Sequence, residues 1–278
     1  MSGIAIFILT ALAMLAFAGN SLLCRTALRQ TPIDAASFTL TRIVSGALIL
    51  WLIVKLRNRS HRVAGNWASA LALFSYGAAF SLAYLSLPAG TGALLLFGAV
   101  QATMILWGMA KGERLRLWQS IGLTLALGGL VALVLPGISA PPLIGSILML
   151  GAGIAWGIYS LRGKSAGDPL RATAGNFLRA VPFAISLSVV ALPWAHFDRA
   201  GFMYAIISGA LTSGIGYAIW YAALPVLSAT GAATVQLSVP VLAAAGGIVL
   251  LGETLTLRFL GATVAVLGGI ALVLKKRG

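Results

Sequence analysis

Three long stretches without a charged side chain constrain this chain more than any other feature. Residues 63–110, 117–161 and 200–252 contain no Asp, Glu, Lys or Arg, and each stretch is about twice the roughly 20 residues that a helix needs to cross a bilayer core. Each also has turn-forming proline and glycine residues near its middle. Each stretch therefore predicts a hairpin of two transmembrane helices.

Four single apolar stretches, near residues 4–23, 36–56, 172–193 and 257–274, raise the predicted total to ten helices. No basic segment precedes the first of them, so we expect a retained helix rather than a cleaved signal peptide. The composition agrees, because 60% of the residues are apolar, 9% are charged and the mean hydropathy is +1.00. The chain is therefore predicted to be an all-α integral membrane protein.

The chain also repeats itself at spacings of 137 to 140 residues. Gly112 and Glu113 recur as Gly252 and Glu253, each pair following an apolar stretch. The other matched positions are Arg42 with Arg179, Tyr84 with Tyr221, Thr91 with Thr230 and Gly128 with Gly268. We therefore predict two related five-helix halves, residues 1–138 and 139–278. An internal repeat in a membrane chain is typical of transporters, with a binding site between the halves.

Five helices in each half mean that the second half enters the membrane from the opposite side. The predicted architecture is thus two inverted five-helix repeats within one membrane domain. Thirteen Lys and Arg residues fall in the loops and terminus expected on one side, and four fall on the other. Because basic loops are retained in the cytoplasm, both termini are predicted to be cytoplasmic. The net charge of +14 is spread over short loops and the C-terminus, which argues against nucleic acid as a partner.

In their order and spacing, these features resemble the drug/metabolite transporter superfamily, and more narrowly its EamA-type ten-helix branch, which includes bacterial amino-acid exporters. The features are the two five-helix halves, an Arg in the second helix of each, a Gly-Glu pair after the fourth and Gly-Gly in the fifth. Residues 17–20 lack the Trp-Gly that the family often carries in its first helix, whereas the second half keeps it at Trp156 and Gly157. The resemblance implies a bacterial inner-membrane protein that exports small metabolites by alternating access.

Charged residues inside a membrane mark function by default, so Arg42 and Arg179 are the first candidates. Each lies about two turns from a helix end, where it can snorkel or bond backbone carbonyls, and the resemblance implies that the second and seventh helices are peripheral. We expect a structural role for both, with substrate binding as the alternative.

Glu113 and Glu253 are predicted either to cap the helices that follow them or to form a gate ion pair. Pro240 is predicted inside the ninth helix, as a hinge or as a fixed kink.

Polar and aromatic side chains at the predicted mid-depth are the candidates for binding cargo. A buried glutamine offers a donor and an acceptor to a zwitterion, so Gln101 and Gln236 fit an amino acid best, although Gln101 can instead bond a neighbouring helix. The remaining candidates are Asn20, Tyr76, Tyr84, Trp156, Tyr159, Tyr217, Trp220 and Tyr221. Their rings can supply an apolar wall or a cation–π contact to an ammonium. For Tyr84 and Tyr221, near helix ends, we expect instead a place in the interfacial aromatic belt. The small residues at 208–214 are interpreted as a helix-packing surface.

No enzyme is expected, because the predicted spans contain no catalytic acid–base pair and no nucleophile. His61 and His196 fall in loops and Cys24 is the single cysteine, so neither a metal site nor a cofactor is predicted. We predict an exporter of small zwitterionic metabolites, above all amino acids, that works as a facilitator or exchanger because no acidic residue falls inside a span. The internal pseudo-symmetry would let a monomer form a complete pathway, unlike an oligomeric channel. The alternative is a neutral hydrophobic metabolite or drug, with proton coupling through Glu113 or Glu253.

Overall fold

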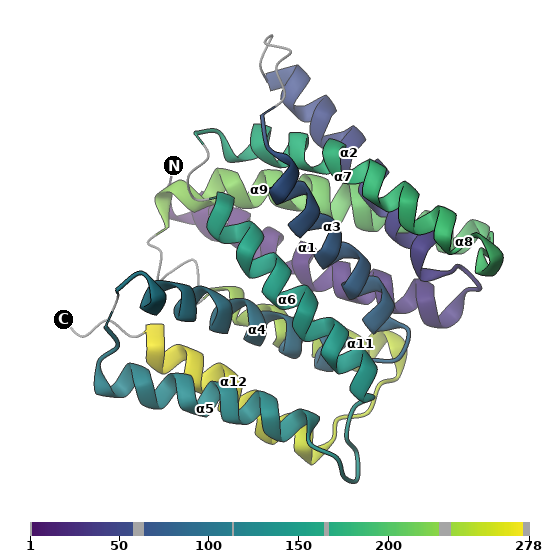
Figure 1. The fold of residues 1–278 in the computed structure, drawn as a ribbon. Coiled ribbons are helices and arrows are strands. Elements are labelled where there is room, and N and C mark those ends of the chain that lie inside the picture. Colours follow the sequence, from purple (N-terminus) through teal and green to yellow (C-terminus); the bar gives the residue numbers. More distant parts are fainter. Residues whose placement is uncertain (1, 58–63, 113, 164–166, 228–234, 275–278) are drawn as a thin grey trace.

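The structure, a computed structural model, describes residues 2–57, 64–112, 114–163, 167–227 and 235–274. Within these ranges every regular element is a helix (Figure 1), so the all-α prediction is confirmed for them. The first half contains α1 (Gly3–Gln30), α2 (Ala35–Arg57), α3 (Trp67–Tyr84), α4 (Ala89–Ala110) and α5 (Leu117–Val134). The second contains α6 (Leu143–Gly163), α7 (Pro169–Val190), the continuous run of α8 (Arg199–Ile207), η2 (Ser208–Ile215) and α9 (Gly216–Ala223), then α11 (Ser238–Leu251) and α12 (Leu257–Leu274). Two 3-10 turns, η1 (Leu192–Trp194) and η3 (Leu224–Val226), follow α7 and α9.

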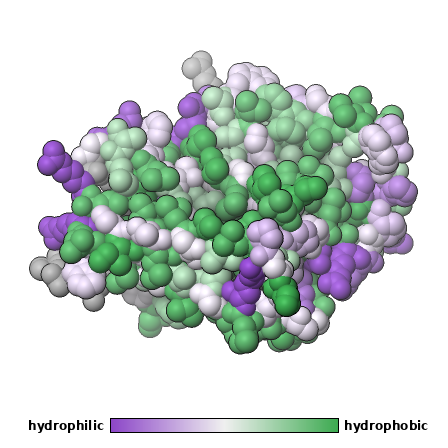
Figure 2. Space-filling view, turned by 60° about the horizontal axis from the view of Figure 1, so that its bottom comes forward, coloured by the Kyte–Doolittle hydropathy of each residue, from purple (hydrophilic) through white to green (hydrophobic). Residues whose placement is uncertain are grey.

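Eight helical segments in the described ranges are long and apolar enough to cross a membrane. They are α1, α2, α4, α5, α6, α7, the run 199–226 and α12. α11 is apolar but has only 14 residues, and α3 has 18. The outer surface is largely apolar in Figure 2, and many large apolar side chains are exposed, which is expected of a surface that faces lipid. The count of ten crossings and the inverted orientation of the second half stay predictions.

Acidic side chains in the loops cap the N-termini of several of these helices. Asp34 accepts hydrogen bonds from the backbone N–H groups of residues 36 and 37, both at 2.9 Å, at the start of α2. Asp168 accepts from the first residues of α7, and Asp198 accepts from Gly201 in α8 at 2.6 Å. A carboxylate satisfies the free N–H groups of a first helical turn and is stabilised by the helix dipole. Three of the five acidic residues of the chain are therefore used as helix caps.

α5 and α12 lie side by side at one end of the molecule, and α2 and α7 at the other (Figure 1). The α5–α12 contact depends on small residues, because a Cβ added to Gly122 would lie 2.5 Å from the carbonyl oxygen of Gly269. A Cβ on Gly129 would lie 2.8 Å from the Cβ of Ala265. In lipid, helices associate by close packing rather than by the hydrophobic effect, so such backbone approach stabilises the pair.

Most contacts between two helices have an equivalent contact between the corresponding helices of the other half. α3 packs on α6, and its counterpart, the run 199–223, packs on α1. α4 packs on α6, and its counterpart α11 packs on α1. α2 with α7, α4 with α11 and α5 with α12 are contacts between counterparts. This is the pattern expected of two copies of one folding unit that face each other.

Candidate functional site

A small central cavity lies between the two halves. Its lining comes from α1, α3, α4, α6, η2, α9 and the residues just before α11. The lining residues are Phe17, Asn20, Ser21, Tyr76, Phe80, Leu96, Phe97, Trp156, Thr212, Ser213, Tyr217 and Gln236. The cavity volume is about 20 Å³, which is room for about one water molecule. The central cavity is therefore closed in this conformation and must widen to hold a metabolite.

Aromatic rings form one wall of the central cavity. Trp156 from α6 stacks on Tyr217 from α9, with ring centroids 5.2 Å apart and planes 27° apart. It also contacts Tyr76 from α3 at 4.8 Å, and Phe17 from α1 meets Tyr217 edge-on at 5.8 Å. Such rings provide a rigid apolar surface whose faces attract cations. Rings from both halves thus meet at one place.

A network of hydrogen bonds runs from the cavity wall into η2. Asn20 donates from Nδ2 to the hydroxyl of Tyr76 at 3.2 Å. Its Oδ1 accepts from the hydroxyls of Ser208 at 2.7 Å and Thr212 at 3.3 Å. η2 is a π-helix of eight residues, a wide turn that is frequent at functional sites. Within the predicted packing surface at 208–214, Thr212 and Ser213 thus also line the cavity.

Arg42 joins this network from α2. Its side chain is 3% exposed, and it donates from Nη2 to the Tyr76 hydroxyl at 3.0 Å and from Nε to Ser213 Oγ at 3.4 Å. The guanidinium carbon lies 4.9 Å from the centroid of the Phe80 ring and 5.2 Å from that of Tyr76. Nη1 is buried without a hydrogen-bond partner among the described residues. The sequence predicted that this arginine snorkels or bonds carbonyls; instead its hydrogen-bond partners are side chains that line the central cavity.

The matched arginine of the second half has different surroundings. Arg179 on α7 is only partly buried. Its Nη1 donates to the backbone carbonyls of Ala64 at 2.9 Å and Gly175 at 3.0 Å. This is the carbonyl-bonded arrangement that the sequence led us to expect for both arginines. The two matched arginines therefore differ in their surroundings, and of the two only Arg42 bonds side chains that line the central cavity.

Five of the ten predicted cargo-binding residues line the central cavity: Asn20, Tyr76, Trp156, Tyr217 and Gln236. Gln101 is buried on α4 but lies outside the lining. Trp220 is buried and contacts Phe17 edge-on with centroids 6.0 Å apart. Tyr159 donates to the Thr173 hydroxyl at 3.2 Å, and Thr173 donates to the hydroxyl of half-buried Tyr221 at 3.4 Å. Tyr159 also stacks on Trp156 with ring centroids 5.2 Å apart, so Trp220 and Tyr159 each contact a residue of the lining.

The expectation that Tyr84 belongs to the interfacial belt is wrong. Tyr84 is completely buried, and its hydroxyl donates to the carbonyl of Ala89 at 3.2 Å. A Cβ on Gly92 would collide with the Tyr84 ring. The glycine therefore creates the space that lets this ring fold inward against α4 instead of outward to the membrane interface.

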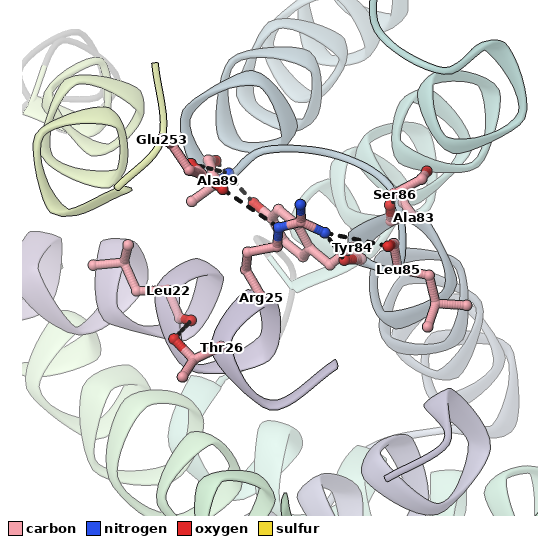
Figure 3. Close-up of polar contacts among 9 residues, drawn as sticks. All are labelled: Leu22, Arg25, Thr26, Ala83, Tyr84, Leu85, Ser86, Ala89 and Glu253. Atoms are coloured by element: carbon pink, nitrogen blue, oxygen red, sulfur yellow. Dashed lines mark hydrogen bonds and ion pairs between the residues drawn. The ribbon is translucent and has the colours of Figure 1, made fainter. Parts of the chain in front are cut away.

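Glu253 forms the ion pair shown in Figure 3. Its Oε1 lies 3.3 Å from Arg25 Nε, and both side chains are less than a tenth exposed. Its Oε2 accepts the backbone N–H of Ala89, at the start of α4, at 2.8 Å. Arg25 Nη1 in turn donates to the carbonyls of Tyr84 at 2.8 Å and Leu85 at 3.2 Å. Glu253 therefore caps α4 rather than α12, which it precedes, and its charged partner comes from α1. Glu113 lies outside the described residues.

Pro240 lies close to an interruption in helical structure. α11 begins at Ser238 after a turn at Leu237, so Pro240 falls in its first turn, where the missing N–H would have no intrahelical partner. Gln236 lies just before this turn and lines the central cavity. The break lies next to the site, and residues 235 and 236 before it are also helical, so a hinge or a fixed kink near Pro240 stays a prediction.

Several residues of the site escaped the sequence analysis. Phe17, Ser21, Phe80, Thr212 and Ser213 line the central cavity, yet each is an ordinary residue of an apolar span. The alternation of serine, threonine and glycine at 208–214 was the one available signal for η2. Among the described residues, no group of three or more His, Cys, Asp or Glu side chains could hold a metal ion.

Comparison with known proteins agrees with this geometry. A model of the EamA-like transporter family matches residues 143–275. The chain is 59% identical to PA1977, an uncharacterized protein of Pseudomonas aeruginosa, over 97% of this chain and 94% of that one. It is 27% identical to an uncharacterized transporter of Archaeoglobus fulgidus over 85% of this chain and 86% of that one.

Two further matches are more limited, one in the length that it covers and the other in its sequence identity. The threonine/homoserine exporter RhtA of Escherichia coli K12 is 34% identical over 149 residues, half of this chain and 49% of RhtA. A solved crystal structure superposes with a TM-score of 0.68 over 98% of both chains at 16% identity, which shows a shared fold. The chain is a multi-pass membrane protein, and its residues 143–275 form an EamA-like transporter domain.

Proposed function

We propose that this protein exports amino acids across a bacterial inner membrane by alternating access. The observation that carries the proposal is the closed central cavity, lined by aromatic and polar side chains from both halves. Rings can face an ammonium, and the amide of Gln236 and the hydroxyls of Thr212 and Ser213 can bond a zwitterion. The RhtA match, which covers about half of each chain, supports the same class of cargo.

The architecture that we propose is one membrane domain of two inverted repeats, residues 1–138 and 139–278, with both termini in the cytoplasm. The exchange-matched helix contacts support the repeat. The excess of basic residues in one set of loops supports the orientation. A single chain then encloses the whole pathway, so a monomer suffices for transport.

The Arg25–Glu253 ion pair is the proposed gate of this pathway. It ties α1 to the α3–α4 turn and to the segment between α11 and α12. By the predicted topology this end of the helices faces away from the cytoplasm. In alternating access such a contact forms in the inward-facing state and breaks when the central cavity opens outward.

The proposed mode of transport is facilitated diffusion or exchange. Among the described residues, no Asp or Glu lines the central cavity, so the site offers no carboxylate to carry a proton. A neutral hydrophobic cargo is the second candidate, favoured by the rings of Phe17, Phe80 and Phe97. The buried charge of Arg42, which lies next to the Phe80 ring, favours the zwitterion.

Efflux from proteoliposomes tests the proposal. Purified protein is reconstituted in liposomes preloaded with labelled L-threonine, L-homoserine or L-phenylalanine, and efflux is followed with and without a pH gradient. Protein-dependent efflux without a gradient is the expected result. Efflux that requires the gradient would refute facilitated diffusion, and a failure to move any amino acid would refute the cargo. Empty liposomes and a protein with the cavity filled by Ser213→Trp are the controls.

A further inference from the structure

Arg42 is a buried cation whose charge no acidic side chain compensates within the described part of the chain. Asp34, Asp168 and Asp198 cap helices in the loops, and Glu253 pairs with Arg25. The hydrogen bonds of Arg42 go to two neutral hydroxyls, and its Nη1 bonds to nothing in the described residues. A guanidinium out of water is costly unless an anion and further hydrogen bonds compensate it.

The neighbours of Arg42 are arranged to receive a ligand rather than to neutralise the charge. The Tyr76 oxygen accepts hydrogen bonds from both Arg42 and Asn20, which leaves the tyrosine's own O–H free to donate. Tyr76, Phe80 and Ser213 all touch Arg42 and all line the central cavity. Arg42 itself is outside this lining, so a carboxylate would meet two kinds of donor there, a guanidinium N–H and a phenolic O–H, once the cavity has widened.

We infer that Arg42 is the receptor for a carboxylate on the transported molecule. This inference rests on the proposed transport function and names the group that the site requires. A bound carboxylate would give Arg42 its missing counter-charge and would accept a charge-assisted hydrogen bond from Nη1. The aromatic wall opposite then holds the rest of the molecule.

The same charges predict which part of an amino acid matters most. In the described lining no carboxylate faces an ammonium, so the amino group meets only ring faces and neutral oxygens. The carboxylate is therefore essential, whereas the ammonium is dispensable. A monocarboxylate that lacks the amine is a ligand of this site, and an amine that lacks the carboxylate is not.

Three matched compounds test this inference by binding. L-Threonine, its carboxamide L-threoninamide and its deaminated analogue 3-hydroxybutyrate are titrated into the purified wild-type protein in detergent, and tryptophan fluorescence reports on Trp156 in the cavity wall. Both carboxylates are expected to bind, and threoninamide is expected to bind about tenfold more weakly or worse, since a hydrogen bond to a charged group is lost. Arg42→Gln should abolish this discrimination, whereas Arg42→Lys should retain part of it because it keeps the charge without the planar fork.

Arg179→Gln is the matched control, because Arg179 occupies the equivalent repeat position and bonds only carbonyls. It should discriminate as the wild type does. Equal binding of threonine and threoninamide would overturn the inference, as would an Arg42→Gln protein that still prefers carboxylates or a wild type that binds none of the compounds. Binding of 3-hydroxybutyrate without threonine would uphold the role of Arg42 and refute the amino-acid cargo. If Arg42→Gln does not fold, the wild-type comparison and Arg42→Lys still decide.

Discussion

The Arg25–Glu253 ion pair gives a quantitative prediction, because the chain has its own reporter beside it. Glu253→Gln removes the negative charge but keeps an oxygen that can accept from Ala89. Cys24 is the single cysteine of the chain, precedes Arg25 and is completely buried. Its reaction with N-ethylmaleimide therefore requires α1 to move away from its neighbours.

The size of the effect follows from the contacts that the substitution leaves behind. Removing one partner of a buried ion pair costs about 3–5 kcal/mol when the other charge is left alone. Arg25 keeps its two carbonyl acceptors at 2.8 and 3.2 Å, so we expect about 2 kcal/mol of that cost. If the loss falls on the closed state, the open population rises about 30-fold, since every 1.4 kcal/mol is a factor of ten.

The assay is the rate at which Cys24 is labelled in the native protein. Glu253→Gln should label about 30-fold faster than the wild type, whereas Asp198→Asn, which removes the charge of the α8 cap and no part of the ion pair, should not. An unchanged labelling rate in a folded Glu253→Gln protein would show that the pair does not hold the closed state. Arg25→Gln should reproduce the effect, and the double substitution should add little to either one.

Three further predictions concern the interior and one loop. Tyr76→Phe removes the hydroxyl that accepts from two buried side chains, so thermal unfolding should show a loss of about 1–3 kcal/mol; an unchanged melting temperature would mean that water replaces it. Gly122→Ala should destabilise the α5–α12 contact by about 1–3 kcal/mol, because its Cβ would lie 2.5 Å from a backbone oxygen, whereas Gly128→Ala on the same helix has open space around its Cβ and should be neutral or slightly stabilising. Burial raises the pKa of Asp34, but hydrogen bonds from the N–H groups of residues 36, 37 and 196 outweigh it and leave that pKa below its usual value. Because the folded-state pKa is depressed, the stabilisation is present above the unfolded value of about 3.9 and is lost as pH falls through the folded pKa. Asp34→Asn should therefore reduce the melting temperature at neutral pH and flatten its decline in acid; parallel declines for both proteins would contradict this.

The helical content of the fold could be predicted from the sequence because the relevant signals are local. Length, apolarity and the absence of charge in residues 63–110, 117–161 and 200–252 are enough to predict helices on each side of a turn. The described helices occur on both sides of each predicted turn. The sequence shows a Gly-Gly pair in each half but not its role, and the structure places Gly129 and Gly269 at the α5–α12 contact.

Only half of the predicted cargo-binding residues line the cavity, because the signals in a sequence are local and do not show which way a side chain faces. Asn20, Tyr76, Trp156, Tyr217 and Gln236 were found because polar and aromatic groups are rare in apolar spans and tend to face inward. Phe17, Phe80 and Ser213 resemble the residues that face lipid or a neighbouring helix. Their local sequence does not indicate that these side chains face the cavity.

The sequence by itself determined the class of protein and the apolar helices, because hydropathy is a property of neighbouring residues, and it predicts a duplication of the chain from matched residues 137 to 140 positions apart. Only the tertiary structure decided which charges meet. Glu253 pairs with an arginine 228 positions away, and Arg42 turns toward the cavity while its repeat counterpart Arg179 bonds carbonyls near the surface. These differences arise because helix rotation and crossing are set by packing between distant segments, and a repeat can conserve a residue without conserving what surrounds it.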